Sequence, residues 1–243
     1  MPDLSGSSPA SHRPLREAGR RPAWLLAAIL CLVTQGAAAT PDYLRAALDH
    51  FTPNVPEGWA YTLATTRNDR QMIERFDPAR PPGTQWSLRT FEGRAPTADE
   101  LEKYAQSRPS ADSGGMQANF KKGDIEPGSI KLVREDEARA EFEAKFRDEA
   151  GGADKMLGHL QLKLIVNKHL AYIERYVLEL TEPYWPVLSV KMNTLRIEAA
   201  FSAPTDTRPS LLDSVESHFA GRVLLISNEE KLHLIYSEFS RTP

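Results

Sequence analysis

Four histidines in the second half of the chain are the first candidates for binding a metal or moving a proton. His159 and His169 stand ten residues apart, at the two ends of one expected strand and its turn, and His218 and His233 fall on different expected strands. Metal sites place their ligands at close spacings on one face, as two histidines one helical turn apart do. The histidine spacing therefore predicts no metal site.

Other patterns that carry chemistry are also missing from the sequence. No serine lies in a Gly-x-Ser-x-Gly elbow or a Ser-x-x-Lys motif, so a serine hydrolase has no recognisable nucleophile. The carboxylate runs Glu135–Glu137 and Glu229–Glu230 are typical of solvated hairpin ends rather than of an acid–base pair. The glycine pairs Gly114–Gly115 and Gly151–Gly152 lie in polar stretches, not between a strand and a helix, so no phosphate loop is predicted.

An enzyme is the least favoured class for this chain. The residues that come nearest to a catalytic cluster are His169, Glu174 and Arg175, and a hydrolase of unknown type stays an alternative. Such an enzyme needs these polar groups to converge inside a pocket. We expect a protein that is not an enzyme and takes no cofactor.

The cysteine count and the net charge exclude further classes. Cys31 is the single cysteine, and it lies within the first 39 residues. A chain without this segment has no disulfide, no thiolate metal site and no cysteine nucleophile. The same segment holds four arginines and two acidic residues, so its removal changes the formal net charge from −3 to −5. A mildly acidic chain without a basic block is a poor nucleic-acid binder, and we expect no nucleic-acid partner.

The first 39 residues have the three parts of a secretory signal peptide. Arginines between positions 13 and 21 form a basic region, Ala23–Val33 is apolar, and Ala37–Ala39 is a run of small residues. The alternative is an uncleaved membrane anchor, which needs about 20 apolar residues. The apolar run here has 11 residues. We expect cleavage after Ala39, no stable membrane span afterwards, and a periplasmic protein.

The elements that must position any site are clearest between Leu157 and Phe239, where apolar and polar residues alternate. Leu160, Leu162 and Leu164 share one side of a strand, and the polar residues between them face the other side. Short segments with Gly, Pro, Asn or paired charges separate the alternating runs. This arrangement is typical of half-buried antiparallel strands joined as hairpins.

Across the whole chain the same reasoning predicts an α+β fold that is mostly β. We expect one domain over residues 40–243, built as a curled antiparallel sheet, or half-barrel, of about ten strands with two or three short helices. The helices are expected at 41–51 and 97–107, the second with Thr97 and Glu100 as a capping box. The strands are expected at 59–76 (a hairpin), 86–90, 130–133, 138–147, 157–166, 171–180, 190–201, 212–226 and 231–240.

Two stretches are harder to assign to a helix or a strand. Residues 108–128 are rich in Gly, Ser and Pro, which predicts a long mobile loop. Residues 137–147 alternate as a strand does, but Phe142 and Phe146 also suit one face of a helix. We favour the strand, because residues 130–133 supply a hairpin partner for it.

The aromatic residues on the expected strands suggest a binding face. Two short helices cannot cover the concave side of a curled sheet of about ten strands, so apolar lining is left for a ligand. We expect a non-enzymatic carrier or sensor that holds an acyl chain or another lipid there. The expected ligand-binding residues are Trp59, Tyr61, Trp86, Phe142, Tyr176, Phe201 and Tyr236.

The alternative is an envelope protein–protein interaction module without a small ligand. Residues 183–188 are apolar and flanked by prolines, so we expect an irregular, exposed hairpin connection rather than a strand. The expected partner-binding residues are Tyr184, Trp185 and Leu188.

The order of the expected elements resembles a known family. A secreted chain with a short helix, an antiparallel meander, one capped helix with a loop and long final hairpins is similar to the periplasmic lipoprotein carriers LolA and LolB. The stretches Asp77–Leu88 and Gly93–Thr97 also resemble uncharacterised exported bacterial proteins. The likeness covers most of residues 42–240 and is one of element order. It implies a half-barrel that holds acyl chains under a helical cover, and it assigns no ligand-contact residue.

Overall fold

The computed structural model describes residues 40–107, 120–150, 155–224 and 226–242. The predicted signal segment 1–39 and positions 108–119 of the predicted loop lie outside these ranges. The described residues form eleven strands, two α-helices and three short 3-10 helices. The prediction of a mostly β, antiparallel sheet with few helices is confirmed. None of the helices in the described ranges has both the length and the apolar character needed to span a bilayer.

The helices are α1 (Asp42–Asp49) and α2 (Ala98–Ser107), with the 3-10 helices η1 (Lys122–Asp124), η2 (Pro127–Ser129) and η4 (Met156–His159). The strands are β1 (Trp59–Arg67), β2 (Arg70–Phe76), β3 (Trp86–Phe91), β4 (Lys131–Glu135), β5 (Arg139–Lys145), β6 (Leu160–Asn167), β7 (Tyr172–Leu180), β8 (Tyr184–Val187), β9 (Val190–Phe201), β10 (Leu212–Val223) and β11 (Ile226–Arg241).

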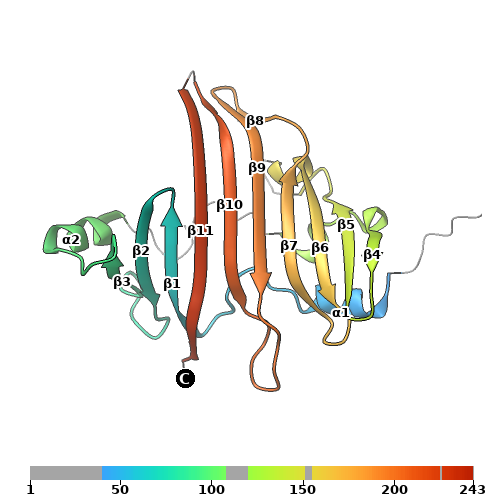
Figure 1. Ribbon diagram of the computed structural model, residues 1–243, viewed down its shortest axis with the longest axis horizontal. Helices are drawn as coiled ribbons and strands as arrows, with labels where there is room; N and C mark the ends of the chain where they lie inside the picture. Colours follow the sequence, from blue (N-terminus) through green and yellow to red (C-terminus); the bar gives the residue numbers. More distant parts are fainter. Residues whose placement is uncertain (1–39, 108–119, 151–154, 225, 243) are drawn as a thin grey trace, which may run out of the picture. The chain divides into compact units, whose positions relative to one another are not determined.

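All strands belong to one open antiparallel sheet in the order β3-β2-β1-β11-β10-β9-β7-β6-β5-β4, with β8 added beside β9 (Figure 1). Most neighbours are joined by hairpins, as the short polar connections predict. There are two exceptions: β7 and β9 pair although β8 lies between them in sequence, and β1 pairs with β11, which joins the first strand to the last. As a result β3 and β4, which follow each other in sequence, form the two opposite edges of the sheet.

The alternation of apolar and polar side chains along each strand decides which face of the sheet is buried. Along β6 every second residue is buried, and Ala140, Phe142 and Ala144 of β5 face the same side. We call this buried side the inner face. Residues 139–145 thus form a strand, as favoured, because β4 and β6 pair with them on both edges. A helix there would leave β4 without a strand partner and one edge of β6 unpaired.

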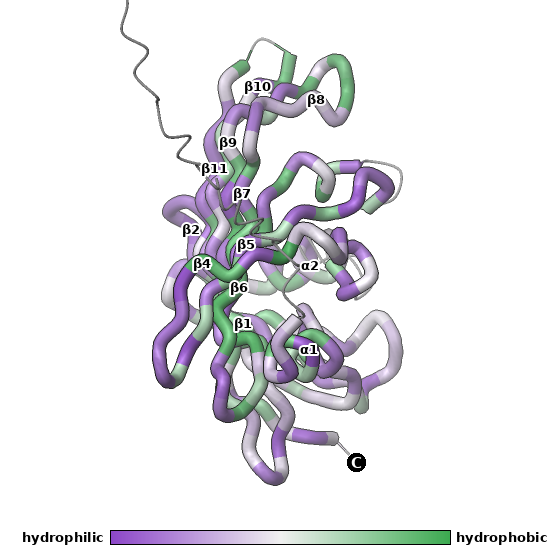
Figure 2. Tube along the Cα trace, turned by 90° about the vertical axis from the view of Figure 1, so that its right-hand side faces the viewer, coloured by the Kyte–Doolittle hydropathy of each residue, from purple (hydrophilic) through white to green (hydrophobic). Residues whose placement is uncertain are grey.

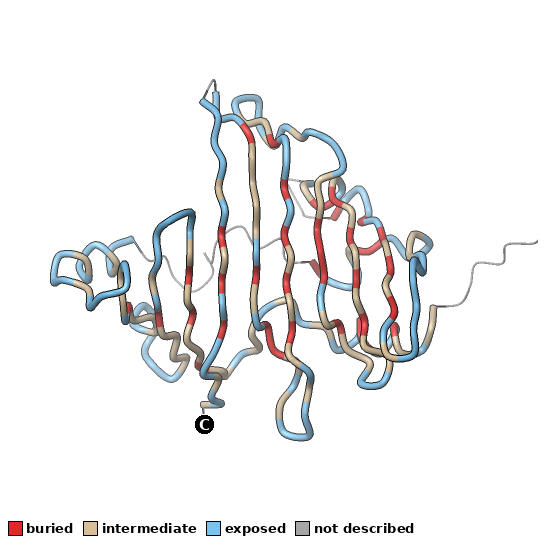
Figure 3. The backbone as a smooth tube through the Cα atoms, viewed as in Figure 1, coloured by how far each residue is buried: buried red, intermediate tan, exposed pale blue. Residues whose placement is uncertain are grey.

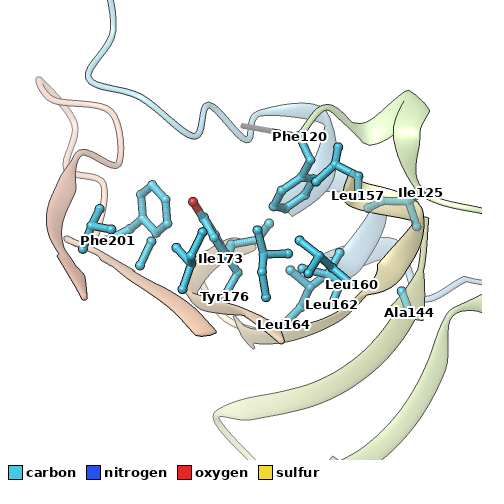
Figure 4. Close-up of a cluster of buried hydrophobic side chains, with 14 of the residues drawn as sticks. Phe120, Ile125, Ala144, Leu157, Leu160, Leu162, Leu164, Ile173, Tyr176 and Phe201 are labelled. Carbon is cyan, nitrogen blue, oxygen red and sulfur yellow. The ribbon is translucent and has the colours of Figure 1, made fainter. Parts of the chain in front are cut away.

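The inner face of β5–β9 is covered by residues from outside the sheet. Leu44, Ala47 and Leu48 of α1 are buried, and the ring of Phe51 just after this helix lies in the same core. Phe120 is fully buried and Ile125 is 3% exposed, and both lie over the inner face in Figure 4. The part of residues 108–128 that is described therefore packs on the sheet.

The strands β9, β10 and β11 extend beyond their neighbours at one end of the sheet. The pairing of β1 with β11 stops where Arg67 lies opposite Leu232, and that of β7 with β9 stops where Glu179 lies opposite Arg196. Beyond these rows, residues 190–195, 219–223 and 226–230 continue as paired strands, with β8 alongside (Figure 1). We call this part the tip extension. Five residues at about 3.4 Å each give it a length of about 17 Å.

Three local predictions differ from the structure. Residues 156–159 form the 3-10 helix η4, so β6 begins later than the expected residue 157. Residues 184–187, expected to be irregular, form the short strand β8, because Val187 pairs with Val190 across a tight turn. The expected strand 212–226 is divided, since its last residue, Ile226, already begins β11.

Candidate functional site

Three of the seven predicted ligand-binding aromatics lie in the core beneath α1. Phe142, Tyr176 and Phe201 are 2%, 3% and 7% exposed. The ring of Phe51 lies 5.9 Å from that of Tyr176 and 5.4 Å from that of Phe201, and Phe120 lies 5.2 Å from Tyr176. Burial raises the pKa of the Tyr176 phenol, as expected for a hydroxyl surrounded by apolar groups. These rings therefore pack against the chain's own residues.

Three more of the predicted residues form a second ring cluster near β1. Tyr61 lies 5.7 Å from Trp86 and 5.5 Å from Tyr236, measured between ring centroids. Phe76 and Phe239 contact the same Tyr61 ring. The seventh residue, Trp59, lies at the start of β1 opposite Arg241. The ring contacts thus form two groups, and six of the seven predicted residues belong to, or pack against, one hydrophobic core.

A shallow depression of about 370 Å³ lies on the polar face of β9–β11. Its charged groups are engaged with one another: His218 lies 3.0 Å from Glu229, and Arg196 lies 2.8 Å from Glu198. The hydrogen bond from His218 lowers the pKa of the Glu229 carboxyl. The depression is lined by Thr66, Asn68, Arg196, Glu198, Glu216, Ser217, His218, Lys231, Leu232 and His233.

Glu174 and Arg175, two of the residues predicted for the hydrolase alternative, interact with different partners. Glu174 accepts hydrogen bonds from Arg139 at 2.6 Å and from Asn167 at 2.9 Å. Arg175 instead pairs with Glu198 of β9 at 2.9 Å. Within the described ranges, no group of three or more His, Cys, Asp and Glu side chains is arranged to hold a metal ion.

The most unusual surface lies at the end of the tip extension, where six large apolar side chains face solvent. Figure 2 shows hydrophobic residues at this end beside β8 and β10, and Figure 3 shows the same end exposed. Leu188 is fully exposed, and Leu224 and Ile226 are 71% and 73% exposed. We define the hairpin-tip patch as Trp185, Val187, Leu188, Val223, Leu224 and Ile226.

Two hairpin ends lie side by side to form this patch. Val187 pairs with Val190, which in turn lies opposite Val223. The backbone N–H of Leu224 donates to the carbonyl of Ser189 at 2.6 Å, so the two turns are tied together. The patch is therefore one continuous surface made by segments about 35 residues apart in sequence.

Leu224, which follows β10, has a backbone conformation that is unfavourable for leucine. Leu224 has a φ of 57°, a left-handed conformation that glycine, asparagine and aspartate adopt most easily. Tight hairpins usually carry Asn or Gly in this conformation, whereas the chain here has Leu224. A leucine that is both conformationally disfavoured and exposed indicates a role other than stability.

Positive charge lies directly behind the apolar end. Lys191 and Arg222 are paired neighbours on β9 and β10, one residue back from Val190 and Val223. The Lys191 ammonium lies 4.8 Å from the centroid of the Trp185 ring, a cation–π contact that holds the indole at the surface.

Of the predicted partner-binding residues, the structure separates one from the other two. Tyr184 packs inward, with its ring stacked on His159 at a centroid distance of 4.1 Å, whereas Trp185 and Leu188 are exposed. Val223, Leu224 and Ile226 were not predicted to bind a partner, because their sequence pattern indicates one long strand over residues 212–226. The run Val-Leu-Leu-Ile at a strand end, without a turn-forming residue, was the signal that could have revealed them.

Comparison with known proteins gives one weak similarity. No protein-family model matches the chain, and no curated protein matches it. Among solved structures, a crystal structure of MucB in complex with MucA(peri) aligns with 83% of this chain and 98% of its own, at 10% sequence identity and a TM-score of 0.22. That score is too low to establish a common fold.

Proposed function

We propose that this chain is an exported, non-enzymatic docking protein of the cell envelope, and that it attaches to an apolar surface through the hairpin-tip patch. The observation that carries the proposal is the patch itself: six exposed apolar side chains on two adjoining turns. Single exposed apolar residues are ordinary, but a contiguous group marks an interaction site.

Burial of the patch offers enough free energy for attachment. Transfer of a Leu or Ile side chain from water to an apolar environment stabilises by about 1.5–3 kcal/mol. Leu188, Leu224 and Ile226 are 104%, 71% and 73% exposed, so almost all of this gain is still available to them. Together they contribute roughly 4–7 kcal/mol on docking.

The inner face supports the carrier alternative less well. A site for an acyl chain needs an apolar cavity with room for the guest. The rings of Tyr176 and Phe201 are buried against Phe51, Phe120 or each other, and the buried ring of Phe142 lies 6.2 Å from that of Tyr43. The charged groups that line the depression on β9–β11 are paired, as Arg196 is with Glu198, and this pairing favours a binding role over an enzymatic one.

The test is sedimentation of the exported protein with washed envelope fragments of a Gram-negative bacterium. Wild type is compared with the tip variant L188S/L224S/I226S. The matched control is L132S/L170S/I235S, which removes three apolar side chains that are 45–53% exposed elsewhere. We expect wild type and the control to sediment and the tip variant to stay in solution. Equal sedimentation of the tip variant and wild type, with both folded by circular dichroism, would refute the proposal.

A further inference from the structure

We propose that the surface which the hairpin-tip patch binds is an anionic lipid bilayer, into whose headgroup region the two turns insert. This inference rests on the docking function proposed above and names its partner. Four features of the tip extension support it: its projection, the charge behind it, the exposed ring of Trp185 and the pairing of its backbone.

The projection lets the patch reach a flat surface before the rest of the sheet does. The tip extension stands about 17 Å beyond the rows where β1 and β7 end, by the rise of a β-strand. Its end carries a fully exposed leucine, Leu188, beside Leu224 and Ile226. A protruding aliphatic end suits insertion among acyl chains, whereas docking on a protein requires a matching hollow on the partner.

The charges nearest to the patch are positive. Lys191 and Arg222 follow the apolar end on β9 and β10, while Ser227 and Asn228 separate the patch from the first acid on β11. That acid, Glu229, is already paired with His218 at 3.0 Å and with Lys231 at 3.4 Å. Cations one residue behind inserted side chains lie at the level of anionic headgroups.

Trp185 adds an interfacial anchor between these two zones. Its ring is 54% exposed and lies beneath the Lys191 ammonium at 4.8 Å. Tryptophan is enriched at the boundary between headgroups and acyl chains, where one side of the indole is apolar and the other is wet. Trp185 lies on β8, the strand that leads to Leu188, and contacts Lys191, and this position matches that boundary.

The backbone of the patch is hydrogen-bonded within the tip. Val187 pairs with Val190, Val223 pairs with Ile226, and the Leu224 N–H donates to Ser189. Unpaired backbone groups are costly to remove from water, so this closure lowers the cost of insertion.

The experiment measures insertion directly with an environment-sensitive dye. In a full chain carrying C31S, a single cysteine is introduced as L188C and labelled with NBD; L170C, at a turn that is 53% exposed, is the matched control. Vesicles of phosphatidylcholine with 30% phosphatidylglycerol, and vesicles of phosphatidylcholine alone, are added. We expect a blue shift and a several-fold rise in emission for the probe at position 188 with anionic vesicles only, and no change at position 170.

The charge argument is tested by K191Q/R222Q in the L188C background. Each cation contributes about a fivefold gain in partitioning into anionic membranes, so the double variant should bind about thirtyfold more weakly, with its fold unchanged by circular dichroism. The inference would be overturned if the emission of the probe at position 188 did not change with anionic vesicles. It would also be overturned if the double variant partitioned into them as strongly as the protein with Lys191 and Arg222. If the protein still sediments with envelope fragments but not with protein-free vesicles, the docking function stands and its partner is a protein.

Discussion

Replacement of Gly221 by alanine tests how closely β9 and β10 approach each other within the tip extension. Gly221 is buried on β10, where the register between β10 and β9 shifts between Ala220 and Gly221. A Cβ atom at this position would lie 2.4 Å from the carbonyl oxygen of Lys191 and 2.7 Å from the ring of Phe219. The Lys191 oxygen belongs to the backbone of β9, so it cannot move without disturbing the pairing of the two strands.

The magnitude follows from the cost of overpacking. Inserting one carbon into a tightly packed site costs about 1–3 kcal/mol. The usual gain of up to about 1 kcal/mol from replacing glycine in a compatible conformation does not offset this clash. For a domain of this size, each kcal/mol lowers the melting temperature by about 2–4 °C. We therefore expect G221A to melt roughly 3–9 °C below wild type.

The assay is thermal unfolding followed by far-ultraviolet circular dichroism, with urea unfolding as an independent measure. The matched control is G128A, since nothing lies within 4 Å of a Cβ atom built at Gly128. We expect the control to stay within about 0.5 kcal/mol of wild type. A G221A protein as stable as G128A would show that β9 and β10 do not approach each other closely at this point.

The remaining predictions concern the core, a buried carboxylate and a helix cap. L164A removes a fully buried side chain of β6 and should lower the free energy of unfolding by about 2–5 kcal/mol in urea, whereas unchanged stability would contradict the described core. Y104F removes the hydroxyl that donates to the buried Glu74 carboxylate at 2.7 Å, so we expect a loss of about 1–3 kcal/mol in the same assay. Glu100 accepts hydrogen bonds from Arg94 and from the Thr97 backbone, which lowers the pKa of its carboxyl to about 2. The folded state therefore binds this proton less readily than the unfolded chain does. The resulting stabilisation is present above pH 4.5 and is lost as the pH falls toward 2. A carboxyl titration by NMR should place the Glu100 midpoint near pH 2 in wild type and higher in R94A, and equal midpoints would refute the assignment.

Local patterns predicted most elements of this fold. The alternation in β6 and β9, the capping box at Thr97 and the turn residues between strands all act over a few neighbouring positions. The pairing of β1 with β11 could not be predicted in this way. It depends on which apolar faces fit together in three dimensions, and alternation gives a strand its face but not its neighbour.

The candidate site was predicted only in part for the same reason. Trp185 and Leu188 were identified because their own segment is apolar and flanked by prolines. Leu224 and Ile226 belong to a distant segment that joins them only through the pairing of Val190 with Val223. The aromatic residues were assigned to the correct kind of surface, but no pattern in the sequence could show that Phe51 and Phe120 cover part of it.

The pairing of the first strand with the last has a consequence for biogenesis. Because β1 pairs with residues 232–241, half of the ladder around it can form only after those residues have been synthesised. Contacts so distant in sequence slow folding. In the exported protein proposed above, this order leaves one edge of β1 unpaired until β11 has been synthesised. Deletion of β11 should then yield a chain that never matures into a protease-resistant form.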